Sequence, residues 1–314
     1  MMNKYLKEYK WSNIGAMMKN DKKDPLICND SFNNKLVVIS GATSGIGYHS
    51  AKEFASHGAN LLLINRNEDK TIKLCEDIKK EFGVKCNYFI CDYTDLEQVK
   101  ALGVKLSNIK EDIDILIHNA GVYLTKRNFT KDGLETVFQV NYLSSFIINY
   151  LLKDKLALQD KAKILFVNSE GHRFAIAGLR IDDLDWKKHH YSGLKGYGSA
   201  KTAQLLSMIT LSKYYENTNV SINSMHPGNV SSNMGENNGK LYKFFKHRIV
   251  SPSSRSPEIS AKALYYLGVS KEVDNENGFF FNLTTKEIPA PHALDKERAW
   301  KLWEKSLALS GLKK

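Results

Sequence analysis

Tyr197 and Lys201 are four residues apart, a spacing that places two side chains on the same side of a helix. A free tyrosine has a pKa of about 10, which is too high for efficient proton transfer near neutral pH. A lysine ammonium beside it favours the phenolate and lowers that pKa. The pair therefore predicts a tyrosine that exchanges a proton with a substrate, although an amphipathic helix with an exposed lysine has the same spacing.

A glycine-rich loop lies far upstream of this pair, between an apolar segment (residues 36–39) and a helix-forming segment. Glycine allows a tight turn and a close approach of the backbone to a pyrophosphate. The N-terminus of the following helix offers unpaired N–H groups and a partial positive charge to phosphates. A tight turn alone also uses glycine, but the strand–turn–helix context favours a dinucleotide. The expected contacts to that dinucleotide are Gly41, Thr43, Ser44, Gly45, Ile46 and Gly47.

The loop and the tyrosine–lysine pair together predict an oxidoreductase that uses a nicotinamide cofactor, and Arg66 predicts which cofactor. NAD-binding folds usually carry an acid at the end of the second strand, where it accepts from the ribose 2′-OH. Asn65 and Arg66 stand there instead, and a guanidinium suits a 2′-phosphate. We therefore expect NADP (NADPH) in preference to NAD; the alternative is an ordinary surface arginine.

Further cofactor contacts are expected where the third and fourth predicted strands end. The carboxylate of Asp92 can accept from an adenine amino group, or it can cap the next helix, although nearby residues can also do so. Ala120 and Gly121 are small enough to let the chain pass close to the adenosine. The amide of Asn119 can hydrogen-bond to neighbouring strands.

Ser169 and Asn141 are the other polar residues expected near the reacting atoms. Ser169 ends the fifth predicted strand beside the expected ligand crevice, where its hydroxyl can polarise a substrate carbonyl; a turn residue is the plainer interpretation. Asn141 lies in an apolar helix, and a buried amide must be hydrogen-bonded. It can hold a water that relays protons to Lys201, or it can be a core residue that bends the helix.

The composition is that of a soluble globular protein, with 42% hydrophobic and 25% charged residues. A formal net charge of +11 is compatible with binding to nucleic acid, to an anionic membrane or to an anionic cofactor. The lysines are spread along the chain, and no zinc-finger or RNA-binding signature accompanies them. We interpret them as a solvated surface and expect no nucleic-acid partner.

The four cysteines, Cys28, Cys75, Cys86 and Cys91, include no CxxC pair. In a chain of 314 residues this indicates free thiols in a reducing compartment, with neither a disulfide framework nor a zinc site. No apolar run approaches the ~20 residues of a membrane span, and no signal-peptide segment is visible. We therefore expect a cytoplasmic protein without a bound metal.

Short apolar segments alternate with helix-period segments from Lys35 onward. Continuous apolar strands that alternate with helices are typical of a parallel sheet covered on both faces. The pattern predicts an α/β fold with a mostly parallel sheet of about seven strands, at residues 36–39, 61–64, 88–90, 113–117, 164–167, 220–223 and 278–281. A long helix is expected over 132–152. We expect a polar N-terminal extension (1–32) and one domain (33–314) with a substrate loop at about 229–257.

These residues, in this order, resemble the short-chain dehydrogenase/reductase family. The resemblance covers the chain from about residue 35 to the C-terminus and is carried by Gly41-x3-Gly45-x-Gly47, Asp92, Asn119-Ala120-Gly121, Asn141, Ser169, Tyr197-x3-Lys201 and His226-Pro227-Gly228. It implies a doubly wound Rossmann fold and a catalytic tetrad of Asn141, Ser169, Tyr197 and Lys201. It also implies cofactor contacts from Tyr197, Lys201, Pro227, Gly228 and Val230, with Pro227 and Gly228 shaping the nicotinamide pocket.

A finer resemblance is to the retinol-dehydrogenase-like branch, which includes the oxidoreductase domain of WW-domain-containing oxidoreductases. It is carried by residues 130–135, 140–143, 168–174 and 302–304. Ser40, His118 and Asn168 depart from the usual family residues, but none of these changes removes a tetrad group. We expect this chain to lack the WW domains and the membrane anchor found in parts of that branch.

The resemblance implies an NADP-dependent oxidoreductase that interconverts an apolar carbonyl and its alcohol, such as an aldehyde, a ketone, or a retinoid- or steroid-like compound. The alternative is an NADPH-binding sensor or scaffold with little turnover. Residues 240–249 combine apolar side chains at helical spacing with basic ones. They predict either a lid over an apolar pocket or, less in keeping with the rest of the chain, a helix that lies on an anionic membrane. A homo-oligomer is compatible with the sequence.

Overall fold

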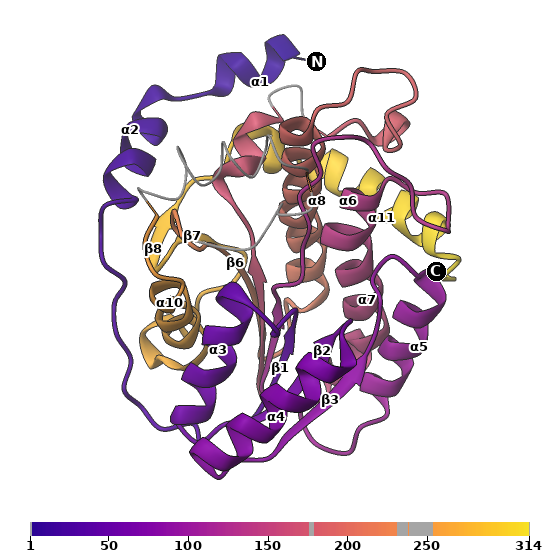
Figure 1. Ribbon diagram of the computed structural model, residues 1–314. Coiled ribbons are helices and arrows are strands. Elements are labelled where there is room, and N and C mark those ends of the chain that lie inside the picture. Colours follow the sequence, from indigo (N-terminus) through magenta and orange to yellow (C-terminus); the bar gives the residue numbers. More distant parts are fainter. Residues whose placement is uncertain (1, 176–178, 231–237, 239–253, 314) are drawn as a thin grey trace.

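An eight-stranded sheet runs through the centre of the protein, in the order β3-β2-β1-β4-β5-β6-β7-β8 (Figure 1). The computed structural model describes residues 2–175, 179–230, 238 and 254–313. The strands are β1 (Leu36–Ser40), β2 (Asn60–Asn65), β3 (Cys86–Ile90), β4 (Ile115–His118), β5 (Ala162–Val167), β6 (Val220–His226), β7 (Phe280–Asn282) and β8 (Thr285–Glu287). Within this sheet β7 and β8 pair antiparallel, and the other neighbouring strands pair parallel. The sheet confirms the predicted Rossmann-type α/β fold and adds the short β8 to the seven expected strands.

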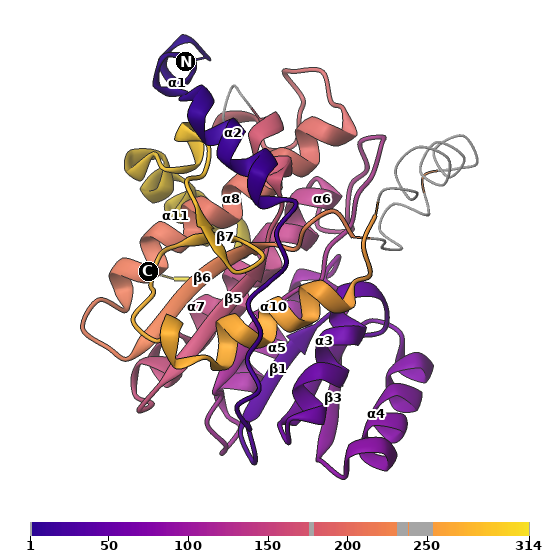
Figure 2. The same ribbon diagram turned by 90° about the vertical axis from the view of Figure 1, so that its left-hand side faces the viewer.

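Helices cover both faces of the sheet (Figures 1 and 2). One face carries α3 (Gly45–Ser56), α4 (Glu68–Phe82) and α10 (Glu258–Val269). The other face carries α5 (Leu96–Ser107), α7 (Ser144–Ala157), α8 (Gly193–Tyr214) and α11 (Lys296–Ser310). Successive strand residues alternate between these two layers: Val37 and Ile39 pack with the first, and Val38 with the second. Because both layers exclude water, the central strands are rich in apolar residues on both faces.

The long helix expected over 132–152 begins later and changes its winding. The carboxylate of Glu135 accepts hydrogen bonds from the first N–H groups of α6 (Thr136–Phe138), so helical structure starts there. A π-helical turn, η1 (Gln139–Leu143), follows and leads into α7. Asp132 is outside the helix and accepts from the Leu96 backbone N–H at 3.0 Å. The predicted start was wrong because Asp132 contacts a distant segment.

The N-terminal segment lies along the β8 edge of the sheet (Figures 1 and 2). It forms α1 (Met2–Glu8) and α2 (Trp11–Asn20). The Tyr5 hydroxyl donates to Asp295 at 2.8 Å, and the Leu26 N–H donates to Thr284 Oγ1 at 2.9 Å. This segment therefore covers an edge that would otherwise expose unpaired strand groups.

All four cysteines are buried free thiols. No helix in the described part of the chain is both long and apolar enough to cross a membrane. Within the same residues no cluster of histidine, cysteine and carboxylate side chains could hold a metal ion. The segment expected to be a lid or a membrane-contacting helix, residues 240–249, lies outside the described residues.

Candidate active site

The glycine loop joins β1 to α3 at the carboxyl end of the sheet. Gly41 and Gly45 have φ angles of 72° and 55°, a backbone region that side-chain-bearing residues rarely adopt. Ser44 precedes α3, but its side chain makes no capping hydrogen bond. The first N–H groups of α3 therefore lack a side-chain cap and can bind phosphate oxygens.

Gly47 is in the first turn of α3 and packs against the preceding loop at Gly41. A Cβ atom at this position would be 2.3 Å from the Gly41 carbonyl oxygen and 2.5 Å from Asn119 Nδ2. That amide nitrogen donates to the carbonyl oxygens of Ser40 and Gly41, at 3.0 and 2.9 Å. Asn119 thus links β4 to the loop, as the sequence predicted, and no side chain fits between them.

Replacing Gly47 by alanine is expected to displace the loop, because the nearest atom is the backbone carbonyl oxygen of Gly41. We expect a loss of about 1–3 kcal/mol in the free energy of unfolding and weaker NADPH binding in a fluorescence titration. Gly15→Ala is the matched control, since Gly15 is an exposed residue of α2 with no atom within 4 Å of the added methyl. An unchanged NADPH affinity in Gly47→Ala would contradict the assignment of this loop.

The residues expected at the adenosine end occupy the ends of β2 and β3. Asn65 is buried, and its Oδ1 accepts from the Ala42 N–H at 2.6 Å, so it supports the glycine loop. Arg66 is exposed, and no described carboxylate forms an ion pair with it. Asp92 Oδ1 accepts from both the N–H and the hydroxyl of Thr94, at 2.9 and 2.8 Å. The cap of α5 is Asp95, which leaves one Asp92 oxygen for a ligand.

The residues expected at the nicotinamide end follow β6. Gly228 has a φ angle of 75°, which turns the chain after Pro227. The Pro227 carbonyl accepts from the buried Ser260 hydroxyl at 2.6 Å, which anchors the turn to α10. Val230 forms an isolated parallel bridge with Arg255. These residues are near the carboxyl ends of the strands, where ligands bind in open α/β sheets.

Ser169 lies two residues after the end of β5 and is the N-cap of the short helix η2 (Glu170–Phe174). Its Oγ accepts from the Gly171 N–H at 2.9 Å, so its own O–H can still donate to a substrate oxygen. A Cβ atom at Gly171 would lie 3.2 Å from Ser169 Oγ and 2.9 Å from Tyr197 Cε1. The serine hydroxyl and the tyrosine ring therefore approach each other across a glycine, from two different elements.

Tyr197 and Lys201 lie in the first turns of α8, whose N-cap is Ser192. The Lys201 Nζ atom is 5.6 Å from the centre of the Tyr197 ring. Lys201 is buried and donates to the Val167 carbonyl at 2.8 Å and to Gln204 Oε1 at 3.1 Å. Burial lowers the pKa of Lys201 to about 7. The structure thus brings the predicted pair together beside Ser169.

Asn141 lies within the π-helical turn η1 and is 1% exposed. Its Oδ1 accepts from the Val122 N–H at 2.7 Å, and its Nδ2 donates to the Val122 carbonyl at 2.9 Å. The side chain therefore holds the segment after β4. The backbone carbonyl of Asn141 accepts from Gln204 Nε2 at 2.7 Å. Gln204 in turn accepts from Lys201, so it lies between the two residues.

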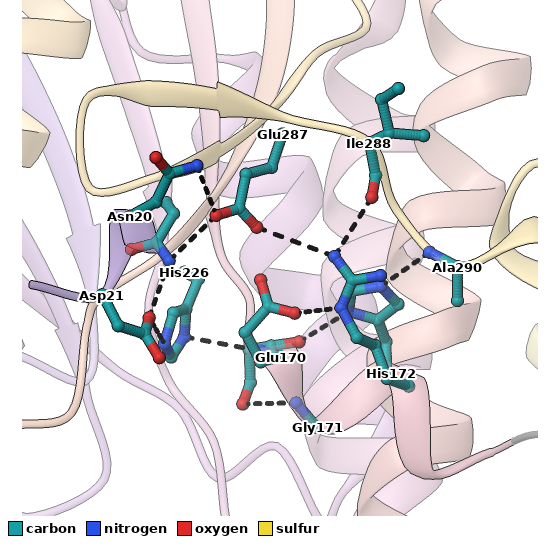
Figure 3. Close-up of polar contacts among 12 residues, drawn as sticks. Asn20, Asp21, Glu170, Gly171, His172, His226, Glu287, Ile288 and Ala290 are labelled. Carbon is teal, nitrogen blue, oxygen red and sulfur yellow. Dashed lines mark hydrogen bonds and ion pairs between the residues drawn. The ribbon is translucent and has the colours of Figure 1, made fainter. Parts of the chain in front are cut away.

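A buried ionic cluster supports the turn that carries Ser169 (Figure 3). We call it the Arg173 cluster; it consists of Glu170, Arg173 and Glu287. The guanidinium forms an ion pair with Glu170, lies 3.6 Å from Glu287 Oε2 and donates to the Ile288 carbonyl at 3.0 Å. Burial raises the pKa of Glu170 to about 7, while the Arg173 charge acts in the opposite direction. Two carboxylates thus share one guanidinium in a partly desolvated site.

The N-terminal segment completes this cluster (Figure 3). Asn20 Nδ2 donates to Glu287 Oε1 at 2.9 Å. Asp21 accepts from Asn282 Nδ2 at 2.7 Å and lies 3.8 Å from His226 Nε2. The chain after α2 is therefore part of the support beneath the predicted site.

His172 fixes the same turn through both ring nitrogens (Figure 3). Nε2 accepts from the Ala290 N–H at 3.1 Å, so Nδ1 carries the proton and donates to the Ser169 carbonyl at 2.8 Å. The ring is neutral, because burial lowers its pKa well below the usual value. The Nδ1 bond holds the Ser169 carbonyl, and the Nε2 bond ties this turn to Ala290.

Sequence reasoning missed the Arg173 cluster, His172 and Gln204 as parts of this site. Glu170 and Arg173 are three residues apart, a spacing that predicts a helical ion pair, but their partner Glu287 is remote in sequence. Gln204 is one turn beyond Lys201 on the same helix, so its proximity was open to prediction. Its bond to Asn141 depends on the packing of two helices.

Known proteins resemble this chain along most of its length. A family model described as short chain dehydrogenase matches residues 35–180. Retinol dehydrogenase 13 of Homo sapiens is 33% identical over 284 residues, which cover 88% of this chain and 85% of that protein. WW domain-containing oxidoreductase of Homo sapiens is 30% identical over 278 residues, which cover 87% of this chain and 67% of that protein.

A solved structure shares the fold. L-sorbose reductase from Gluconobacter frateurii, in complex with NADPH and L-sorbose, matches with a TM-score of 0.63 at 20% sequence identity. The match covers 81% of this chain and 96% of the reductase chain.

Proposed function

Because the chain belongs to the short-chain dehydrogenase/reductase family, in the branch of retinol dehydrogenase 13 and the WW domain-containing oxidoreductases, we propose that it transfers hydride between NADP(H) and a carbonyl or alcohol carbon. The observation that carries this proposal is the approach of Ser169 Oγ and the Tyr197 ring across Gly171, with Lys201 behind them. Family and branch are those predicted from the sequence.

Each tetrad residue has a role that fits its position. Ser169 and Tyr197 hydrogen-bond the substrate oxygen, and Tyr197 gives its proton to that oxygen as the carbon accepts hydride. Bound NADPH supplies the hydride, and the reverse reaction returns it. The Lys201 ammonium stabilises the phenolate left on Tyr197 and binds the nicotinamide ribose. Asn141 holds the loop after β4 through Val122, and its backbone carbonyl accepts from Gln204, which in turn accepts from Lys201.

The choice of NADP over NAD rests on Arg66. Its guanidinium is exposed near the glycine loop and is not engaged by a described carboxylate. Asn65, which precedes it, is a neutral amide rather than an acid, and its buried Oδ1 faces the Ala42 N–H. The NADPH complex of L-sorbose reductase shows that this fold accommodates the same cofactor in another protein.

The substrate is proposed to be apolar. Tyr123 lies edge-on to Tyr197, with ring centres 5.7 Å apart, and provides an aromatic wall beside the reacting oxygen. Retinol dehydrogenase 13, a relative in the same branch, is named for an apolar alcohol. Aliphatic and aromatic aldehydes, ketones, retinoids and steroids are the classes to test.

The first experiment is an assay of NADPH and NADH oxidation against that panel of carbonyl compounds. We expect turnover with NADPH and much less with NADH. Binding of NADPH without turnover of any compound would favour the alternative, a nucleotide-binding sensor. Failure to bind or oxidise NADPH would refute the proposal.

Arg66→Ala is expected to weaken NADPH binding and leave NADH binding unchanged. Loss of a charge-assisted hydrogen bond of about 1.5–3 kcal/mol corresponds to a roughly 10- to 150-fold increase in Kd. Isothermal titration with both cofactors measures this, and Lys70→Ala, an exposed residue in the first turn of α4, is the matched control. An equal loss for both cofactors would remove the 2′-phosphate assignment.

A further inference from the structure

A buried glutamine connects two residues of the predicted tetrad. Gln204 Nε2 donates to the Asn141 carbonyl oxygen at 2.7 Å, and Gln204 Oε1 accepts from Lys201 Nζ at 3.1 Å. Gln204 is 1% exposed and Lys201 is 2% exposed, so bulk water does not compete for these bonds. The lysine charge therefore depends on protein atoms for its solvation.

The same amide oxygen has a second donor. Gln204 Oε1 accepts from Asn168 Nδ2 at 3.0 Å, and Asn168 Oδ1 accepts from the Ser169 N–H at 2.7 Å. Two donors face the oxygen and one carbonyl faces the nitrogen, so only one orientation of the amide satisfies all three partners. Inverting it would direct N–H groups at the lysine ammonium.

Few charged groups surround the Lys201 ammonium. Val167 accepts from it on β5, and the Tyr197 ring faces it from the preceding turn of α8. In the part of the chain that the structure describes, no carboxylate forms an ion pair with it. Titratable groups on the packed elements have other partners: His172 of η2 bonds to Ser169 and Ala290, and Tyr142 of η1 bonds to Ser306. Glu170 of η2 bonds to Arg173, and His118 of β4 bonds to Asn149.

We propose that Gln204 is a positioning residue that holds the Lys201 ammonium and thereby sets the pH range in which Tyr197 is active. The inference rests on the proposed function for its effect on turnover, but its effect on the lysine does not require turnover. An amide that gives up an N–H proton becomes an unstable imidate. Gln204 therefore fixes a charge between Lys201 and Asn141 and does not conduct protons between them.

Two substitutions are expected to move the titration of Lys201 in opposite directions. Gln204→Met keeps the length of the side chain but removes the amide oxygen, which destabilises the ammonium and lowers the pKa of Lys201. Gln204→Glu places a carboxylate beside the ammonium and raises that pKa. Each shift is expected to be about one pH unit, the equivalent of one hydrogen bond to a charged group. Both variants lose the donor to Asn141, so a purely structural role predicts the same result for both.

The shifts are measured in two ways. Lysine labelled with carbon-13 at Cε reports the pKa of Lys201 in the cofactor-free protein by NMR, with Lys201→Arg used to assign the signal. In the direction of carbonyl reduction, the alkaline limb of kcat should move to lower pH in Gln204→Met and to higher pH in Gln204→Glu. Thr210→Val is the matched control: Thr210 is a buried polar residue further along α8 that bonds to Ser207, and it should move neither value.

Opposite shifts of the Lys201 signal would support the proposal even if no carbonyl compound is reduced, in which case only the proposed function fails. Turnover with an unmoved or equally moved pH limb would overturn the role of Gln204 and leave the proposed function intact. Gln204→Leu serves in place of Gln204→Met if the latter does not give a cooperative thermal transition. An unmoved Lys201 signal in either apolar variant refutes the proposal.

Discussion

Tyr197→Phe is expected to lower the turnover number by about 10²–10⁴-fold, the usual contribution of a general acid. The variant keeps the ring that packs on Gly171 and beside Lys201, so the fold and the NADPH affinity should change little. Only the proton that the substrate oxygen receives is lost. Steady-state kinetics with NADPH and an active carbonyl compound, together with an NADPH titration, measure both properties.

Tyr214→Phe provides the comparison on the same helix. Tyr214 is exposed, and its hydroxyl donates to Asp154 far from the glycine loop. We expect its turnover to equal that of the unsubstituted protein. Retained turnover in Tyr197→Phe would show that another group supplies the proton, and the tetrad assignment would then be wrong.

Arg173→Met is expected to cause the largest loss of stability, about 3–5 kcal/mol in the free energy of unfolding, because it leaves a buried ion pair without its cation. Methionine fills a similar length, so lost packing contributes little. Glu170 and Glu287 would then face each other in a site from which water is largely excluded. Chemical denaturation followed by circular dichroism measures the change. The turn of Ser169 should also lose its support, which lowers turnover.

The loss should depend on pH. The pKa of Glu170 is about 7 in the folded protein, above its ordinary value of 4.5, chiefly because of burial. A carboxyl with a raised pKa contributes its full stability below the unfolded pKa and loses it as the pH rises through the folded pKa. Removing Arg173 raises the folded pKa further, so the loss continues to higher pH. The difference between the two proteins should therefore widen as the pH rises through about 7.

The double variant Glu170→Gln with Arg173→Met tests the cause. It removes one of the two carboxylates, so it should recover part of the lost stability and reduce the pH dependence. Equal stability of Arg173→Met and the unsubstituted protein at all pH values would show that the ion pairs of the cluster contribute nothing measurable.

The parts of the fold that depend on residues adjacent in the sequence could be predicted from the sequence. The apolar runs that become β1 and β5 are buried on both faces, and such runs are recognisable without knowing what covers them. The glycine loop is equally local, because Gly41 and Gly45 require unusual φ angles within one turn. Tyr197 and Lys201 share a helix face by spacing alone. Local geometry thus predicted the sheet and the residues of the candidate site.

Tertiary packing decided what those groups bond to. Asp132 was expected in a helix, but it bonds to the N–H of Leu96, in a segment 36 residues away in sequence. Asn20 meets Glu287 across a separation of 267 residues, and no local pattern marks either as a partner of the other. The Gln204–Asn141 bond joins two helices through residues that are 63 positions apart in the sequence. Such bonds exist because buried polar groups must find partners wherever packing places them, and the sequence alone does not show that placement.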